Sequence, residues 1–426
     1  MFKKTIPLII ILTAFTVSFA YNITFCRNAE VMTHWSQHID GLFYQAIART
    51  VVEKGIIGYN EVRPTSFRPP LYPLFLSGIY YILGYNFFIV RILQSILHGL
   101  TCLLIFLIGR NIFNRNVGIT AAILFAVNPF LIFFSGEIGT ETLFTFLIAA
   151  TIYSITLFLK SKNKTLVLIM SGLLFTASMM TRTIFLSLLP FLIIWLYYVS
   201  DKKNAWKNVI VFFLSFFIAL MPWIIRNYSV HGHFVLSGTN MGHNLNIGAL
   251  MEGVDYGKAL KKFKEIAGYD YKDLENPKNR SLPTSEYELQ KQGIERALKL
   301  IAADPAKWIK VRALNAFNLW SNNWEGNYAK KFAEEKSSYI KTASHYYYLF
   351  ILFFGILGIA FTAKESDRDK RNILYLILLL FLAGTAGYCV FQTGKRYRVP
   401  IIDPYLAIYT SYFLFVIKDK ISKFTK

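Results

Sequence analysis

Residues 34–73, HWSQHIDGLFYQAIARTVVEKGIIGYNEVRPTSFRPPLYP, form a polar stretch in a chain that is otherwise largely apolar. Asp40 and Tyr44 lie four residues apart, which places both on one face of a predicted helix. Arg68 then opens a proline-rich turn at 69–73, where the backbone is stiff. Apolar segments lie on both sides of this stretch, so it is a loop at a membrane surface. A carboxylate in such a loop indicates a site.

The composition predicts an all-α, polytopic integral membrane protein. The chain has 426 residues, of which 54% are hydrophobic and 17% charged, whereas ordinary soluble proteins carry roughly 25% charged residues. The mean hydropathy is +0.39. Apolar runs close to the length of a membrane span recur along the whole chain, and each is typical of a transmembrane helix.

The formal net charge of +21 is explained by membrane orientation rather than by nucleic-acid binding. Lys and Arg occur in short runs between apolar segments, which is the distribution that orients membrane proteins. A nucleic-acid-binding protein would gather them on one face or along one helix. The three cysteines have neither the spacing of a metal site nor that of a disulfide framework.

Ten apolar segments are predicted to span the membrane. The first follows Lys3 and Lys4 and is long enough to remain as an uncleaved helix. The predicted spans are 5–25, 88–109, 117–134, 140–159, 165–181, 183–200, 207–225, 346–363, 372–391 and 400–417.

The positive-inside rule places both termini in the cytoplasm and the loops 26–87 and 226–345 outside. Residues 69–84 are apolar but short and begin with prolines. If they spanned the membrane, the later positive clusters would lie outside, so a re-entrant or interfacial helix is predicted. The chain divides into a transmembrane catalytic module, a mainly helical outer loop and a group of C-terminal transmembrane helices, at 1–225, 226–345 and 346–426.

This topology brings carboxylates and guanidinium groups from distant loops to the outer face. Acids can act as bases or metal ligands, and arginines can hold a phosphate with two hydrogen bonds. The cationic turn at 395–398 breaks the positive-inside pattern, which indicates that a partner holds it there. The candidate substrate-binding residues are Tyr44, Arg68, Tyr72, Glu137, Arg226, Asn227, His243, Asn244, Lys395, Arg396 and Arg398.

Several of these residues have a structural alternative. Asp40 can cap the helix that follows it. Glu137 and Glu141 can complement the dipole of the next helix. Arg226 can anchor the membrane interface beside a tryptophan. Arg182, at an outer helix junction, is compatible with either role.

The loop 226–345 contains the one large polar region of the chain. Its Gly/Asn-rich part at 237–253, which includes His243 and Asn244, is predicted to be irregular and able to approach a ligand closely. The loop holds no Walker sequence, no Gly-x-Ser-x-Gly and no metal-type cluster. Helices are predicted at 256–267, 284–303 and 305–320, the last beginning with Asp304 and Pro305.

Six sequence pieces together resemble the GT-C glycosyltransferases, specifically glycosyltransferase family 39 with the protein O-mannosyltransferases and the bacterial lipid A aminoarabinose transferase. Five run in family order over about the first 250 residues, and the sixth lies near the C-terminus. The pieces are HIDGLFYQAIA, FRPPLYPLF, RILQSILHGL, NVGITAAILFAVNPFLIFFSGEIGTETLF, MPWIIRN and KRYRVPIIDPYLAI.

The resemblance implies a sugar donor linked to polyprenyl phosphate, and a reaction on the outer face of the bacterial cytoplasmic membrane. The family's first-loop and second-loop acids correspond to Asp40 and Glu141, the candidate catalytic residues. Many relatives have two acids in the first loop, whereas Gly41 follows Asp40 here. A divalent metal ion is therefore left open, and no other cofactor is implied. The acceptor can be a lipid, a glycan or a protein.

Sugar transfer from a phosphate needs a base for the acceptor and stabilisation of the departing phosphate. Asp40 is the candidate base, while Arg226, Arg396 and Arg398 are candidates for the phosphate. No enzyme nucleophile is evident, which favours a single displacement with inversion. The alternatives are a transporter or flippase of lipid-linked sugars, and a polysaccharide polymerase or ligase. Transporters are typified by internal repeats and ionisable residues at mid-membrane, which the sequence does not show.

Overall fold

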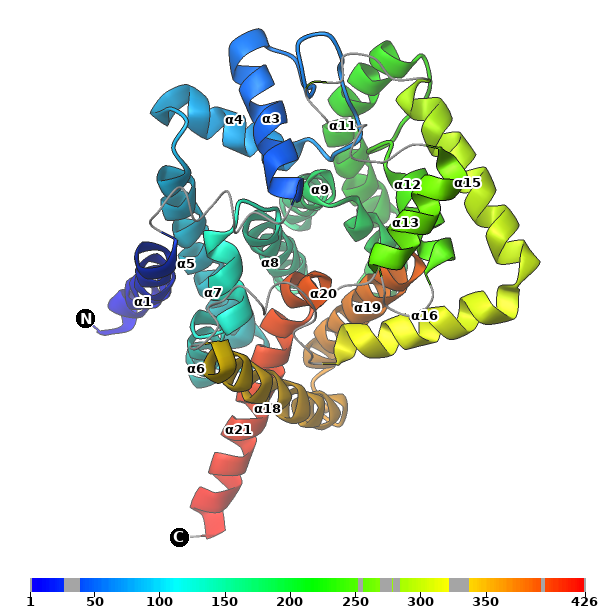
Figure 1. Ribbon diagram of the computed structural model, residues 1–426. Helices are drawn as coiled ribbons and strands as arrows, with labels where there is room; N and C mark the ends of the chain where they lie inside the picture. The colour runs from blue at the N-terminus through cyan, green and yellow to red at the C-terminus, as the bar shows by residue number, and fades with distance from the viewer. Residues whose placement is uncertain are drawn as a thin grey trace.

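The computed structural model is built from helices throughout the residues that it describes (Figure 1). Those residues are 2–26, 39–251, 256–268, 278, 284–321, 337–391 and 395–424. The start of the quoted polar stretch, at 34–38, lies outside them.

The N-terminal half consists of a long succession of helices, with the loop 55–70 between α3 and α4. They are α1 (Phe2–Phe25), α3 (Ile39–Lys54), α4 (Leu71–Leu83), α5 (Phe87–Ile112), α6 (Arg115–Ala126), α7 (Pro129–Gly136), α8 (Glu141–Phe158), α9 (Lys164–Thr181), the 3₁₀ helix η1 (Thr183–Leu188), α10 (Leu189–Val199) and α11 (Ala205–His231).

The C-terminal half begins with helices outside the bundle and returns to it. They are α12 (Met241–Leu250), α13 (Tyr256–Ala267), α15 (Glu286–Ala303), α16 (Pro305–Trp320), α18 (Ser337–Ala363), α19 (Arg368–Val390), α20 (Lys395–Ile401) and α21 (Asp403–Phe424). The helices predicted at 256–267, 284–303 and 305–320 are thus confirmed within two residues. Asp304 caps α16, because its side chain accepts a hydrogen bond from the Lys307 amide at 2.9 Å.

Seven described helices are long and apolar enough to cross a membrane, or up to eight if α6 and α7 form one span. These two are bent by 53° at their junction, where Asn128 caps α7 and Pro129 cannot continue α6. The chain is therefore an all-α polytopic membrane protein, as predicted. The two remaining predicted spans are helical but do not meet these criteria: Thr183–Val199 is too short, and α21 ends in a lysine-rich turn.

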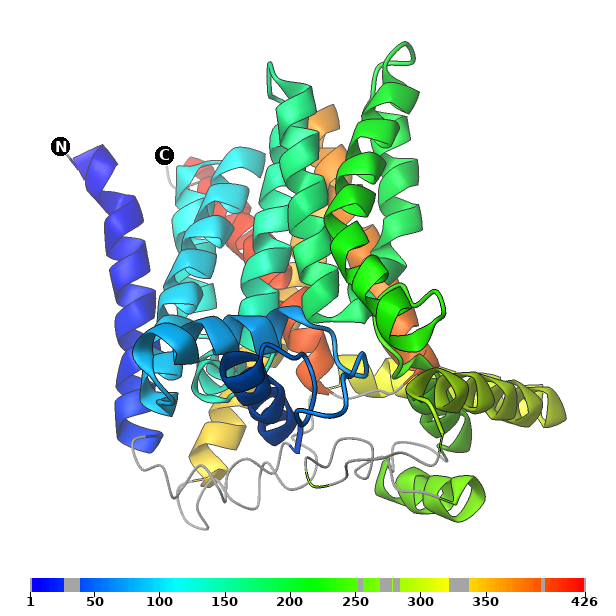
Figure 2. The ribbon, with the colours of Figure 1, turned by 90° about the horizontal axis from the view of Figure 1, so that it is seen from above.

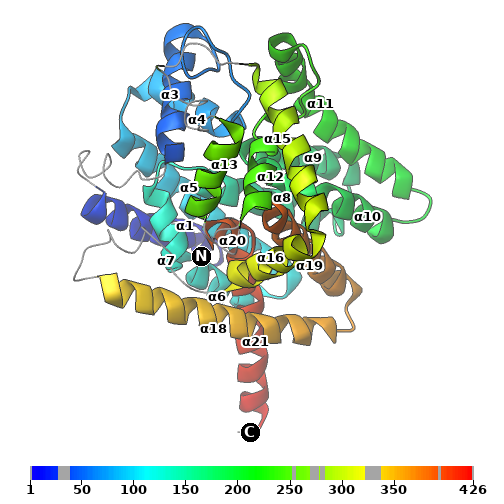
Figure 3. The same cartoon turned by 45° about the vertical axis from the view of Figure 1, so that its right-hand side comes forward.

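Both termini lie at one end of the bundle, and the helices of the two long loops lie at the other (Figure 2). Helices α3, α4, α13 and α15 all gather at that second end (Figure 3 gives another view). This is the arrangement that the charge pattern predicts, because it places both long loops on one side. We call this end the loop end.

Helix α4 lies across the loop end instead of running along the bundle (Figure 2). Its 13 residues span about 20 Å, too little for the roughly 30 Å hydrocarbon core. Pro70 precedes it, and Gly84 ends it with a φ of 77°, a conformation that favours glycine. Tyr81 and Ile82 are 79% and 76% exposed, as expected of a helix lying on a membrane surface.

The Gly/Asn-rich part of the long loop was predicted to be irregular, and this prediction is wrong. Residues 241–250 form helix α12. Its glycines serve close packing: a Cβ on Gly242 would lie 2.0 Å from the Gln290 carbonyl oxygen, and one on Gly248 would lie 2.2 Å from that of Phe391. Contact between helices therefore explains these glycines.

The sidedness of the loop end can be tested with single cysteines at Ser285 and Ser366. We expect Ser285→Cys to react with an impermeant maleimide in sealed, right-side-out vesicles, and Ser366→Cys to react only after permeabilisation. The three native cysteines are buried and should give little background. If only the Ser366→Cys variant were labelled in sealed vesicles, the orientation of the chain would be the opposite of the one predicted.

Candidate active site

Asp40 lies in the first turn of α3, and both of its carboxylate oxygens are bound by arginines. Arg68 Nη2 donates to Oδ1 at 2.9 Å, and Arg396 Nη2 donates to Oδ2 at 3.0 Å. Arg68 precedes α4, and Arg396 lies in α20, so three distant stretches meet at this carboxylate. Helix α3 begins at Ile39, which places Asp40 inside the helix and not at the capping position before it.

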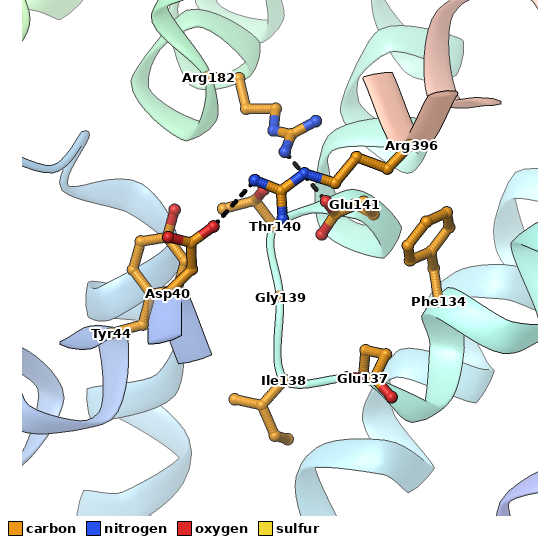
Figure 4. Close-up of a pocket in the computed structure, with 10 residues that line it drawn as sticks. All are labelled: Asp40, Tyr44, Phe134, Glu137, Ile138, Gly139, Thr140, Glu141, Arg182 and Arg396. Carbon is orange, nitrogen blue, oxygen red and sulfur yellow. Dashed lines mark hydrogen bonds and ion pairs between the residues drawn. The ribbon is translucent and has the colours of Figure 1, made fainter. Parts of the chain in front are cut away.

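A second ion pair joins Glu141 to Arg182, whose Nη2 lies 3.0 Å from Oε1 (Figure 4). Glu141 is the first residue of α8. Arg182 occupies the break between α9 and η1, where the backbone is extended. At this break the guanidinium lies over the rings of Phe144 and Tyr397, at 5.7 and 5.1 Å from their centroids.

A pocket lies between the two ion pairs (Figure 4). Its empty space is about 290 Å³ including the open mouth. Segments that are far apart in the chain form its wall, and the turn between α7 and α8 forms one side. The lining residues are Asp40, Tyr44, Phe134, Glu137, Ile138, Gly139, Thr140, Glu141, Arg182 and Arg396.

Two glycines make this arrangement possible. A Cβ on Gly139 would lie 2.6 Å from Glu141 Oε2, and a Cβ on Gly41 would lie 2.8 Å from the Ile138 carbonyl oxygen. Gly41 therefore lets α3 approach the turn beside the pocket. A second acidic side chain directly after Asp40 would collide with this backbone, which gives a packing reason for the glycine at this position.

Glu137 faces the pocket from the end of α7 (Figure 4). Removal of its carboxylate from water raises its pKa from 4.5 to about 7, although Arg91 acts in the opposite direction, and Glu141 adds to the rise. The side chain therefore exchanges its proton near neutral pH, in a pocket where such a group can take part in proton transfer.

The raised pKa predicts a pH-dependent stability. The unfolded carboxyl group ionises near pH 4.5, whereas the folded one holds its proton up to about pH 7. Folding should therefore be most favoured below pH 4.5 and lose stability as the pH rises to 7. We expect Glu137→Gln to lower the slope of the thermal unfolding midpoint between pH 5 and 7. The exposed Glu295→Gln is the control, and equal slopes in all three proteins would contradict the assignment.

Other candidate residues lie outside this pocket. Tyr72 is buried behind Tyr44 and donates to Gln94 Oε1 at 3.0 Å. Arg226 donates to Ser66 Oγ at 2.7 Å and to the Ile57 carbonyl at 2.8 Å. Arg226 therefore holds the loop that leads to Arg68 in place. The adjacent Asn227 also contacts this loop, because it accepts a hydrogen bond from Ser66 Oγ.

Arg398 pairs with Asp403 in the protein interior. Its Nε lies 3.0 Å from Asp403 Oδ1, and both side chains are 0% exposed. The guanidinium also lies 3.5 Å from the Tyr348 ring centroid. His243, in α12, packs against the rings of Phe67 and Phe263, and Asn244 is the next residue of the same helix. Neither residue lines the pocket. The side chain of Lys395 lies outside the described residues.

Arg182 is the charged pocket residue that the sequence interpretation did not select. The available signal was a single arginine between two apolar segments, at a junction predicted to be outside. That signal did not distinguish a binding residue from an interfacial one, because the partner Glu141 lies on another helix.

The contacts of the pocket carboxylates bear on the divalent metal ion that the sequence left open. Asp40 and Glu141 each face a guanidinium group. Within the part of the chain that the structure describes, no three His, Cys, Asp or Glu side chains form a group that could hold a metal. A metal bound by Asp40 would have to displace Arg68 or Arg396, whereas Arg182 binds only Oε1 of Glu141.

A protein-family model matches part of the chain. Residues 67–225 match the family model of dolichyl-phosphate-mannose-protein mannosyltransferase. No curated protein matches the sequence significantly.

Solved structures show the fold. The oligosaccharyltransferase AglB from Archaeoglobus fulgidus, in complex with an inhibitory peptide and a dolichol-phosphate, superposes with a TM-score of 0.59 at 14% identity, covering 100% of this chain and 52% of AglB. Its apo form gives 0.60, also at 14% identity and with the same coverage. This chain thus spans about half the length of AglB.

ArnT from Cupriavidus metallidurans, bound to undecaprenyl phosphate, is also similar, at 12% identity over 86% of this chain and 72% of that one. Its TM-score of 0.39 is too low to show a shared fold. The AglB superpositions and the family match confirm the resemblance to the GT-C glycosyltransferases. The chain is thus a polytopic membrane protein with the fold of the GT-C glycosyltransferases, and its residues 67–225 follow the mannosyltransferase family pattern.

Proposed function

We propose that this protein transfers a sugar from a polyprenyl-phosphate-linked donor to an acceptor at the loop end, which faces the outside of the membrane. One observation carries the proposal: a pocket at the loop end combines carboxylates with arginines. A lipid phosphate requires cations at that depth, and an acceptor hydroxyl or amine requires a base.

The comparisons support the choice of donor. The matching family model is described by a dolichyl-phosphate-linked mannose, and the AglB structure holds a dolichol-phosphate. We infer that a donor of the same class, a sugar on a polyprenyl phosphate, binds here with its tail among the membrane helices.

Asp40 is proposed as the base. The acceptor oxygen or nitrogen attacks the anomeric carbon, the bond from that carbon to the phosphate oxygen breaks, and the electron pair leaves with the phosphate. The acceptor's proton passes to Asp40. This single displacement inverts the anomeric configuration. When Arg396 turns towards the phosphate, one oxygen of Asp40 becomes available to the acceptor.

Transport of lipid-linked sugars is the second candidate class, and one experiment separates it from transfer. The purified protein is incubated in vesicles with a polyprenyl-phosphate sugar labelled in the sugar, together with extracted lipid, glycan or protein acceptors. We expect label in an acceptor and release of polyprenyl phosphate. Movement of intact donor across the bilayer with no labelled acceptor would overturn the proposal. Formation of chains of repeating units would identify a polymerase.

A further inference from the structure

Two of the residues that line the pocket are arginines, and Figure 4 shows their guanidinium groups close together. Arg182 is held by Glu141, and Arg396 by Asp40. Each arginine also lies over the Tyr397 ring. Each cation is thus paired with one carboxylate, and both guanidinium groups line the same pocket.

Arg182 has hydrogen-bonding capacity left over. Its Nη2 binds Glu141, but its Nη1 is buried and has no hydrogen-bond partner among the described residues. The side chain as a whole is 13% exposed. Buried donors are usually satisfied, so a bound water or a ligand can supply the partner of this nitrogen.

From this arrangement we propose that Arg182 and Arg396 together bind the phosphate of the lipid-linked donor, an assignment that rests on the proposed function. A phosphate offers several acceptor oxygens, so it can bridge two guanidinium groups. Each planar guanidinium can donate two parallel hydrogen bonds to it. The pocket lies where α8 begins and α9 ends, at the end of two membrane helices. This is the depth at which the phosphate of a lipid with its tail in the bilayer lies.

Glu141 is then a positioning residue. Its carboxylate accepts a hydrogen bond from Nη2 of Arg182 and so fixes the guanidinium group beside the pocket. Gly139 supports this placement, since a Cβ there would lie only 2.6 Å from Glu141 Oε2. The two other arginines considered for the phosphate are already engaged: Arg226 with Ser66 and a backbone carbonyl, and Arg398 with Asp403.

Binding of farnesyl phosphate to the purified full chain in detergent tests the assignment without requiring sugar transfer. We expect Arg182→Gln to weaken binding by roughly 10- to 100-fold, as for loss of a charge-assisted contact, and Arg182→Lys to weaken it less. Arg312→Gln is the matched control. Arg312 is also a buried arginine, but it donates to backbone carbonyls away from the pocket, and its replacement should leave binding unchanged.

The double variant Arg182→Gln/Glu141→Gln keeps the test decisive if the single variant folds poorly, because it leaves no unpaired carboxylate in the pocket wall. Its thermal unfolding midpoint reports folding, and its affinity reports the site. Parent-like affinity in a folded double variant would overturn the assignment. Equal binding of farnesol and farnesyl phosphate to the parent would do the same, since the phosphate would not be recognised.

Two competitors identify the source of the phosphate. Inorganic phosphate at high concentration should displace farnesyl phosphate weakly, and phosphatidylglycerol in mixed micelles should not displace it. Displacement by phosphatidylglycerol at the same concentration as farnesyl phosphate would indicate a structural lipid and overturn the donor assignment. If binding depends on Arg182 but the parent transfers no sugar, the proposed function fails while the phosphate site stands. If Arg182→Gln still transfers sugar and binds farnesyl phosphate like the parent, the phosphate site is refuted and the proposed function is not.

Discussion

Asp40→Asn is expected to lower the rate of sugar transfer by about a hundredfold or more, since general-base catalysis contributes at least that much. Asn has nearly the size of Asp but cannot accept the acceptor's proton. It also removes the charge that Arg68 and Arg396 bind. The measurement is the initial rate of label transfer at saturating donor, compared at equal amounts of folded protein.

Asp304→Asn is the matched control for this variant. Asp304 caps α16 through the Lys307 amide, and Asn caps a helix about as well as Asp. The control should therefore transfer sugar like the parent. Near-normal transfer by a well-folded Asp40→Asn protein would show that Asp40 is structural, and the base would have to be sought elsewhere.

Arg398→Ala is expected to lower the free energy of unfolding by about 3–5 kcal/mol, because breaking a buried ion pair leaves an uncompensated charge. Both Arg398 and Asp403 are 0% exposed, and Nη1 of the arginine also donates to the Ser321 carbonyl. The loss would be read as a lower denaturant midpoint in detergent. Replacing both partners, as in Arg398→Met/Asp403→Leu, should restore much of the stability, because no charge remains unpaired.

The control for this prediction is an exposed ion pair on the same helix as Asp403. Lys423 and Asp419 lie 2.7 Å apart in α21 and are 74% and 49% exposed. Lys423→Ala should cost no more than about 0.5 kcal/mol. If Arg398→Ala unfolds like the parent but loses affinity for farnesyl phosphate, Arg398 binds the donor and its pairing with Asp403 does not persist.

The sequence predicts the broad arrangement of the membrane helices and loops, because hydropathy and charge are properties of short stretches of the chain. Apolar runs identify the membrane helices, and the Lys and Arg distribution places Asp40 and Arg396 on the same side although they are far apart in the chain. The structure brings them to 3.0 Å. Asp304 and Pro305 likewise mark the start of α16 correctly, since capping depends on neighbouring residues alone.

Partners that depend on helix packing could not be predicted. In the sequence, Arg226 and Arg398 cannot be distinguished from an exposed arginine beside a membrane helix. In the structure, Arg226 binds a loop and Arg398 binds a carboxylate in the protein interior. The pairing of Arg182 with Glu141 depends on how two helices are placed side by side. Helix α12 was missed because glycine lowers helix propensity, whereas here it permits close contact between helices.

The contact between Asp40 and Arg396 joins residues 356 positions apart, which has a consequence for biosynthesis. At the usual rates of translation, roughly 20 to 70 s separate the synthesis of the two residues. During that interval α3 can already be in place, but its carboxylate lacks one of its two arginine partners. A chain stalled before residue 395 would therefore insert most of its helices and still have an incomplete pocket. Unfinished copies in the membrane are for this reason expected to be inactive in the proposed sugar transfer.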